Sequence, residues 1–242
     1  MSVYRPGLKG VMIVALGLMS GAVLASTGTV TQLSGTLSVL KADGSVRILS
    51  QKSEVVSGDT VNTQKNSYAQ IKFSDGGLIT LKPNTSLKIQ QFHFRKAEPA
   101  KDSFVFNLVK GGLRAITGLI GKRGNKDAYK LDTVTATIGI RGTSYGADDC
   151  LTTPCPKPDS SGNLEPGVYV NVTDGEIVVT NNAGSQNFRA GQFGEISDRN
   201  SRPRFLSTDP GLQFVPPASF IVSILTGAAA NSGKNQECVV RP

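Results

Sequence analysis

Residue types that carry out chemistry are sparse in this chain. Among its 242 residues are one histidine, three cysteines and 18 acidic residues. His93 lies between two phenylalanines, with no serine, cysteine or carboxylate cluster beside it, so we expect a solvated or hydrogen-bonded histidine and not a catalytic base. Asp59, Asp75 and Asp174 each adjoin a glycine, where aspartate ordinarily bonds nearby backbone. We therefore expect no enzyme and no cofactor.

The cysteines predict a disulfide and no metal centre. Cys150 and Cys155 lie at the two ends of a short loop, which a disulfide between them could close in oxidising surroundings. Cys238 would then have no partner cysteine. A zinc site takes about four nitrogen or sulfur ligands, and a chain with one histidine does not supply that set.

One segment is purely basic. Residues 103–126 contain five basic side chains and no acidic one. These are Lys110, Arg114, Lys122, Arg123 and Lys126. The stretch 121–126 is superficially similar to a phosphate loop but lacks its Gly-Lys-Ser/Thr ending and a following helical pattern. Two interpretations stay open: a solvated basic turn, or a surface that binds an anion or a partner.

The stretch Thr133–Tyr145 reads as a half-buried strand. Small or aliphatic residues at 134, 136, 138 and 140 alternate with threonine or glycine, a period of two. Arg141 falls on the face opposite these aliphatic residues, between Gly139 and the pair Gly142–Thr143. A guanidinium donates up to five hydrogen bonds, so we expect Arg141 to bind carbonyls at strand ends, as a structural motif and not a binding site.

The rest of the pattern predicts an all-β fold. Short alternating runs recur about every ten residues, and 27 glycines with no tryptophan suit many strands joined by tight turns. We expect turns at Asp43–Ser45 and Lys110–Gly112, and a bulge at Gln90–Gln91. Residues 30–45 are echoed at 170–185, which indicates that the β architecture continues to about residue 196. The expected arrangement is short antiparallel strands in a β-roll, a β-helix-like stack or a sandwich, with a short C-terminal helix beginning near Phe220.

Several blocks carry a family resemblance. In chain order they are Gly58–Thr63, Asp75–Gly77 leading to Leu81–Thr85, Lys110–Arg114 and Thr133–Tyr145. Together they resemble the FecR-type domain of bacterial envelope proteins, over a family core of about residues 30–145. The resemblance implies an all-β extracytoplasmic domain and, in the best-known members, signalling across the inner membrane to a sigma factor.

The N-terminal segment resembles a secretory signal peptide. Arg5 and Lys9 precede a short apolar run, and small residues predict cleavage after Ala25; an uncleaved anchor is the alternative. The expected organisation is a signal peptide at 1–25, a β domain at 26–196 with an irregular insert at 148–166, and an extended tail with a short docking segment at 197–242. Members similar to the ferric citrate regulator have a cytoplasmic segment and an internal span before the β domain. Here we expect an exported, stand-alone form without the cytoplasmic anti-sigma segment.

The predicted export limits which partners the protein could have. Loss of Arg5 and Lys9 would lower the net charge from +8 to +6, so the mature chain would be mildly basic. We expect this mature chain to be periplasmic or secreted, with no membrane span and no nucleic-acid partner. We expect a non-catalytic module for envelope protein interaction or signal sensing, with an unidentified envelope protein as partner. The alternative is a secreted structural protein that binds anionic glycan or lipopolysaccharide through its basic loop.

Overall fold

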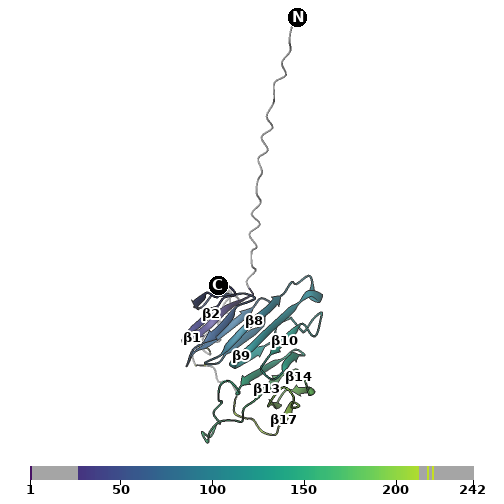
Figure 1. The fold of residues 1–242 in the computed structure, drawn as a ribbon. Coiled ribbons are helices and arrows are strands. Elements are labelled where there is room, and N and C mark those ends of the chain that lie inside the picture. The colour runs from purple at the N-terminus through teal and green to yellow at the C-terminus, as the bar shows by residue number, and fades with distance from the viewer. Residues whose placement is uncertain (2–26, 213–216, 218–219, 221–242) are drawn as a thin grey trace, which may run out of the picture.

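The computed structural model describes Met1, residues 27–212, Pro217 and Phe220. Apart from Met1, the segment expected to be a signal peptide lies outside these residues with its predicted cleavage site, as do the helix expected beyond Phe220 and Cys238. Strands joined by turns dominate the described part, which confirms the all-β class (Figure 1). Its one short 3-10 helix, η1, spans Pro99–Lys101, and no helix there is long and apolar enough to cross a membrane.

The strands follow one another with short connections. In chain order they are β1 (Gly28–Ser34), β2 (Leu37–Leu40), β3 (Val46–Leu49), β4 (Glu54–Val55), β5 (Thr60–Thr63), β6 (Tyr68–Phe73), β7 (Leu78–Leu81), β8 (Ser86–His93), β9 (Ser103–Ile116), β10 (Tyr129–Asp132), β11 (Thr137–Ile140), β12 (Ser144–Asp149), β13 (Val168–Asp174), β14 (Glu176–Asn181), β15 (Gly184–Arg189), β16 (Phe193–Ile196) and β17 (Arg204–Leu206). β17 lies in the segment where we expected a tail.

The strands form two open sheets. Sheet I has the order β4-β1-β6-β7-β9-β12-β13-β16-β17. Sheet II has the order β3-β2-β5-β8-β9-β10-β11-β14-β15. Every pairing is antiparallel except that of β9 with β10. Apolar side chains from both sheets meet in one buried cluster, so of the three arrangements expected, two packed sheets describe the protein best.

Strand β9 belongs to both sheets. Its first half, up to Lys110, pairs with β8 in sheet II, and its second half, from Gly111, pairs with β12 in sheet I. The turn expected at Lys110–Gly112 is therefore wrong: the chain bends there but continues as a strand. Gly111 has φ +80°, and a Cβ on it would lie 2.6 Å from Thr85 Cα, so the bend requires glycine.

The other crossings between the sheets follow the same plan. β1 and β13 lie in sheet I, and each continues into sheet II, as β2 and β14, through a glycine with positive φ, Gly35 or Gly175. These glycines are equivalent positions in the echo between residues 30–45 and 170–185. A Cβ on Gly175 would overlap the carbonyl oxygen of Gly142, which is itself a corner glycine between β11 and β12. The echo in the sequence thus marks a repeated corner.

A pair of tyrosines joins the sheets inside the core. Tyr129 on β10 and Tyr145 on β12 are both buried, and their hydroxyl oxygens are 2.9 Å apart in a hydrogen bond. Burial, with a smaller contribution from Tyr145, raises the pKa of Tyr129 well above its ordinary value, and burial likewise raises the pKa of Tyr145. Both hydroxyls therefore stay neutral and satisfy each other.

Two local expectations have different outcomes. The bulge expected near Gln90–Gln91 is confirmed, because the β8–β9 register shifts between Ile89 and Gln91. The strand expected over Thr133–Tyr145 is only partly right, since residues 133–136 form a turn before β11 and Val134 is exposed. Thr133 closes that turn by donating its hydroxyl to Ala136 O and accepting from Ala136 N. This local hydrogen bonding competes with the strand pattern.

Candidate functional site

The aspartates of the family blocks are structural. Asp59 is buried and accepts from Lys41 Nζ at 2.8 Å and from Val56 N at 3.0 Å. Asp75 is also buried, and its carboxylate accepts from the backbone N–H groups of Gly77 and Ile120. Each carboxylate fixes two chain segments, so neither presents a free group to a substrate.

The block Gly139–Thr143 is also structural, although less through Arg141 than expected. The hydroxyl of Thr143 donates to Glu176 O at 2.7 Å, and its backbone N–H donates to Thr117 Oγ1. Arg141 uses only Nη1, toward the carbonyl oxygens of Ile140 and Lys126 at 3.1 and 3.4 Å, and lies 3.8 Å from the exposed carboxylate of Asp127. Thr143, which the sequence reading treated as secondary, therefore makes the stronger connection.

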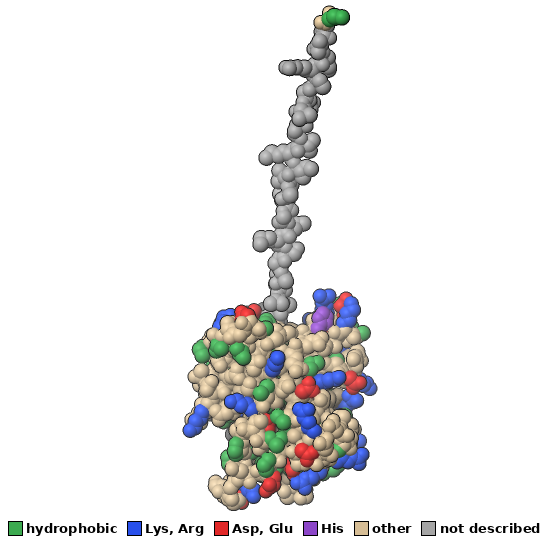
Figure 2. Space-filling view, in the orientation of Figure 1, with side chains coloured by type: hydrophobic (Ala, Val, Ile, Leu, Met, Phe, Trp, Pro, Cys, Tyr) green, Lys and Arg blue, Asp and Glu red, His purple; other side chains and the backbone are tan. Residues whose placement is uncertain are grey.

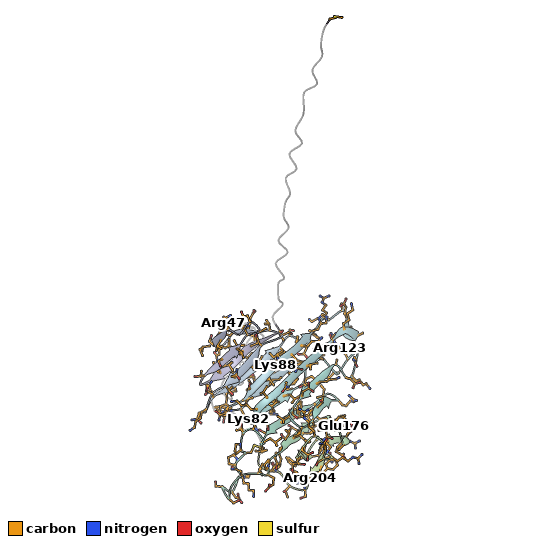
Figure 3. The ribbon with its side chains drawn as sticks, viewed as in Figure 1. Arg47, Lys82, Lys88, Arg123, Glu176 and Arg204 are labelled. Carbon is orange, nitrogen blue, oxygen red and sulfur yellow. A yellow bond between two sulfur atoms is a disulfide. The ribbon has the colours of Figure 1, made fainter. Side chains whose placement is uncertain are left out.

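The five residues of the basic segment do not form one surface. Arg123 pairs with the fully buried carboxylate of Asp102 at 3.0 Å and donates to the carbonyl oxygens of Arg95 and Lys96. Its guanidinium also lies 4.7 Å from the centre of the Phe94 ring, a cation–π contact. The guanidinium of Arg123, labelled in Figure 3, is thus already engaged by contacts within the protein.

The remaining four basic residues lie in separate places. Lys122 and Lys126 line a cavity of about 260 Å³ together with Arg141. Lys110 is exposed on β9, and Arg114 lines a different cavity, of about 240 Å³. The sequence therefore overestimated the size of the basic surface. Only three cations lie together, and one of them, Arg141, comes from outside the basic segment.

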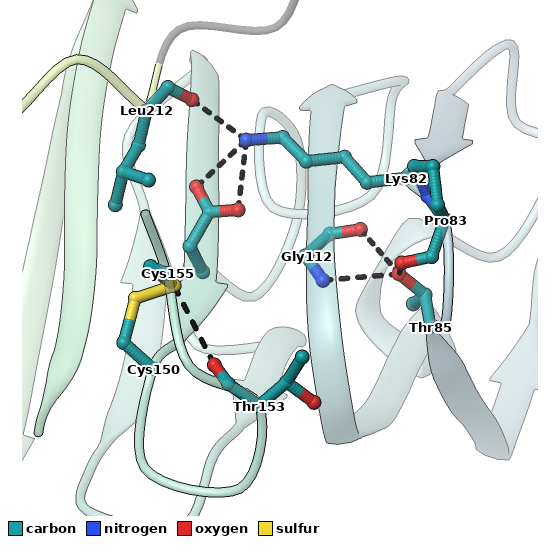
Figure 4. Close-up of polar contacts among 9 residues, drawn as sticks. Lys82, Pro83, Thr85, Gly112, Cys150, Thr153, Cys155 and Leu212 are labelled. Atoms are coloured by element: carbon teal, nitrogen blue, oxygen red, sulfur yellow. Dashed lines mark hydrogen bonds and ion pairs between the residues drawn. A yellow bond between two sulfur atoms is a disulfide. The ribbon is translucent and has the colours of Figure 1, made fainter. Parts of the chain in front are cut away.

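The sequence reading missed a buried ion pair on the outer face of sheet I. Lys82 Nζ contacts both carboxylate oxygens of Asp148, at 2.7 and 2.9 Å, and donates to Leu212 O at 2.6 Å (Figure 4). A Cβ on Gly112 would overlap the Asp148 carboxylate, so this glycine leaves room for the pair. Burial raises the pKa of Asp148, although attraction to Lys82 opposes the shift.

The insert begins two residues later than expected. Asp148 and Asp149 belong to β12, and Asp149 accepts from the backbone N–H groups of Leu151 and Thr152 at the start of the loop. The structure joins Cys150 and Cys155 in the expected disulfide, which fixes the loop close to the Lys82–Asp148 pair (Figure 4).

His93 is half-buried at the end of β8, opposite Ser103 in the register with β9. No group of three or more His, Cys, Asp and Glu side chains within the described ranges is placed to hold a metal ion.

An exposed apolar edge is the other feature that sequence reasoning missed. β3 pairs with β2 and with no other strand of residues 27–212. Val46 and Ile48 on β3 are 67% and 71% exposed, and Leu40, opposite Val46 on β2, is 42% exposed. Arg47, marked in Figure 3, lies between the two β3 residues and is also exposed. The alternation of this short run predicted a strand but not its place at an edge.

A family comparison explains the motif blocks. The model of the FecR protein family matches residues 59–178, from the buried Asp59 directly before β5 to Val178 in β14. This chain carries a FecR domain. The match covers the blocks from Asp59 to Tyr145, but it begins and ends later than the family core of about residues 30–145 that the resemblance indicated. No protein with a curated description matches the chain.

Solved structures similar to this FecR-domain chain have low identity. One, a cell surface anchoring domain, is 26% identical over 25% of this chain and 80% of its own, with a TM-score of 0.25. Two structures of a proposed anti-sigma factor from Parabacteroides distasonis are 14% and 13% identical. Both cover 69% of this chain and 72% of their own, with TM-scores of 0.45 and 0.43.

Proposed function

We propose that this chain is a non-catalytic interaction or sensing module of the bacterial envelope, periplasmic or secreted, that recognises another protein and transforms nothing. The FecR family match supports a regulatory role. The disulfide supports an oxidising compartment, since such bonds persist outside the cytoplasm. The buried aspartates described above all hold the fold together, which leaves the surface as the functional part.

The observation that carries this proposal is the open edge at β3. An edge strand presents backbone N–H and C=O groups to which a partner strand can add. In the β2–β3 hairpin Lys41 N bonds Ser45 O, so by the antiparallel alternation the backbone groups of Val46 and Ile48 point away from β2. A partner strand would thus find hydrogen-bonding groups and apolar side chains at the same two residues.

Arg47 indicates which partner fits. In an antiparallel pairing of two copies centred on this residue, Arg47 would face Arg47, and like charges directly opposite destabilise a sheet. An extended segment of another protein, with an acidic residue between two apolar ones, would instead complement the edge. We therefore propose strand addition by an envelope protein of that pattern.

Photo-crosslinking in the full chain tests this proposal. A photoreactive phenylalanine at Ile48 should give one discrete adduct with another protein, and Arg47→Glu should reduce its yield severalfold because the charge complement is reversed. The same probe at Leu119, 44% exposed in a loop on sheet I, is the matched control. An adduct that is a dimer of this chain, or equal adducts from both positions, would contradict the proposal.

The cation-lined cavity supports a second candidate, binding of anionic glycan or lipopolysaccharide. Lys122, Lys126 and Arg141 surround it, and exposed cations attract polyanions in a salt-dependent way. Lys122→Glu with Lys126→Glu should make the protein elute from immobilised lipopolysaccharide at a clearly lower salt concentration. The control Lys65→Glu with Lys72→Glu has the same charge change at two exposed positions elsewhere. Equal elution of both double variants would rule this candidate out.

A further inference from the structure

A line of polar side chains crosses the outer face of sheet II. The strand registers place one residue from each of seven strands side by side. In order these are Thr60, Lys88, Asn107, Asp132, Thr137, Thr180 and Ser185. At about 4.8 Å between strands the line is roughly 29 Å long. Figure 2 views this face near β8, β9 and β10, where uncharged polar side chains and backbone dominate and charges are scattered.

The line passes through a cavity of about 270 Å³. Its floor comes from Asn107, Asp132 and neighbouring threonines, and one wall is the turn at residues 133–136. Arg199 also lines the cavity and donates from Nε to Val134 O at 2.7 Å, which holds the turn in place. The cavity is therefore built by the segment that the sequence pattern predicted as one continuous strand.

One hydroxyl at this cavity is unsatisfied. Thr135 is 3% exposed, and its Oγ1 is buried with no hydrogen-bond partner in the part of the chain that the structure describes. A buried hydroxyl without a partner costs about 1–3 kcal/mol, and such groups in native proteins are uncommon. Because the oxygen is buried, the Thr135 side chain must turn toward the cavity before this hydroxyl can bond a group from outside.

The other polar groups supply both donors and acceptors. The Asn107 carboxamide has no hydrogen bond within residues 27–212, and Asp132 uses only Oδ1, to accept from Thr137 at 2.7 Å. Arg199 lines the same cavity, and its charge is opposite to that of Asp132. Carboxylate oxygens accept, guanidinium nitrogens donate, and amides and hydroxyls do both.

We propose that this cavity binds a neutral sugar unit, with the line of polar side chains supporting neighbouring units of an oligosaccharide. Each sugar hydroxyl is both donor and acceptor, which matches the mixed set around Thr135. The balanced charges of Asp132 and Arg199 favour a neutral ligand over the polyanion considered for the cation-lined cavity. The site lies apart from β3, so it does not depend on the protein interaction proposed above.

Isothermal titration with defined neutral hexasaccharides tests the inference. The probes are hexamers of β-1,4-glucose, α-1,4-glucose and β-1,4-N-acetylglucosamine, added to the full chain, and at least one should bind. Thr135→Val removes the unsatisfied hydroxyl at nearly constant shape, so the affinity should fall about 5- to 10-fold, as expected for one lost hydrogen bond. The same change should leave the melting temperature equal or higher, which separates binding from folding.

Two further variants sharpen the test. Asn107→Ala should weaken binding similarly, whereas Ser38→Ala, on the same face but outside the cavity, should not change it. Absence of binding to all three hexamers, or equal affinities for the wild type and Thr135→Val, would overturn the proposal. So would a crystal structure of the soaked protein in which only an ordered water contacts Thr135.

Discussion

Arg123→Leu should lower the free energy of unfolding by about 3–5 kcal/mol, because it leaves a buried carboxylate without its cation. The side chain of Asp102 is fully buried, whereas that of Arg123 is 24% exposed, so the aspartate cannot turn to solvent without breaking the local structure. The substitution also removes the donors to the carbonyl oxygens of Arg95 and Lys96, which tie the loop before η1 to the loop after β9. Urea unfolding followed by circular dichroism measures the loss.

Two controls separate this effect from the loss of a surface charge. Lys126→Leu makes the same charge change at an exposed lysine and should alter stability by less than about 0.5 kcal/mol. Arg123→Leu combined with Asp102→Leu removes both charges and should recover most of the loss. If Arg123→Leu alone cost less than 1 kcal/mol, the pair would be a surface contact and Arg123 would be available for anions after all.

A loss of similar size, about 3–5 kcal/mol at neutral pH, is expected for Lys82→Met. This change leaves the buried carboxylate of Asp148 without its cation and removes the donor to Leu212 O. Asp148→Asn should cost much less, within about 1 kcal/mol, because the desolvation of the charged aspartate already outweighs the attraction of Lys82. The two variants should thus differ in cost, whereas equal partners would give equal losses.

The loss in Lys82→Met should depend on pH. Burial raises the pKa of Asp148 in the folded protein above its ordinary value of 3.8. Protonation therefore favours the folded state: this contribution is complete below pH 3.8 and is lost as the pH rises through the raised pKa. Without Lys82 the charged form is less favourable still, so the deficit relative to wild type should shrink from pH 7.5 to pH 5. A deficit that is constant or grows toward pH 5 would contradict this account.

Local sequence patterns predicted the fold class because the strand period and the bulge depend on residues that are neighbours in the sequence. The two-residue period of β6 and the bulge in β8 both follow from short-range sterics and burial. The bend inside β9 did not follow, because Lys110–Gly112 has the same composition as a turn. Only the pairing of β9 with strands from both sheets shows that the chain continues.

The candidate site was harder to predict because its partners are distant in sequence. Arg123 could be recognised as basic, but Asp102 is 21 residues away in a segment that reads as a loop. Lys82 and Asp148 are 66 residues apart, and Thr135 and Arg199 meet only after the sheets have formed. The threonines at 133, 135 and 137 were visible as an alternating row, yet nothing local indicates that one hydroxyl lacks a partner.

The shared strand β9 also determines how the protein unfolds. Its fourteen residues are hydrogen-bonded into sheet II by the first half and into sheet I by the second half. Unfolding of either sheet would therefore disturb the strand that the other sheet needs for its backbone hydrogen bonds. The two sheets are thus connected covalently through β9 as well as by their common hydrophobic core. Because unfolding of one sheet is transmitted to the other through this strand, the domain should unfold as a single cooperative unit.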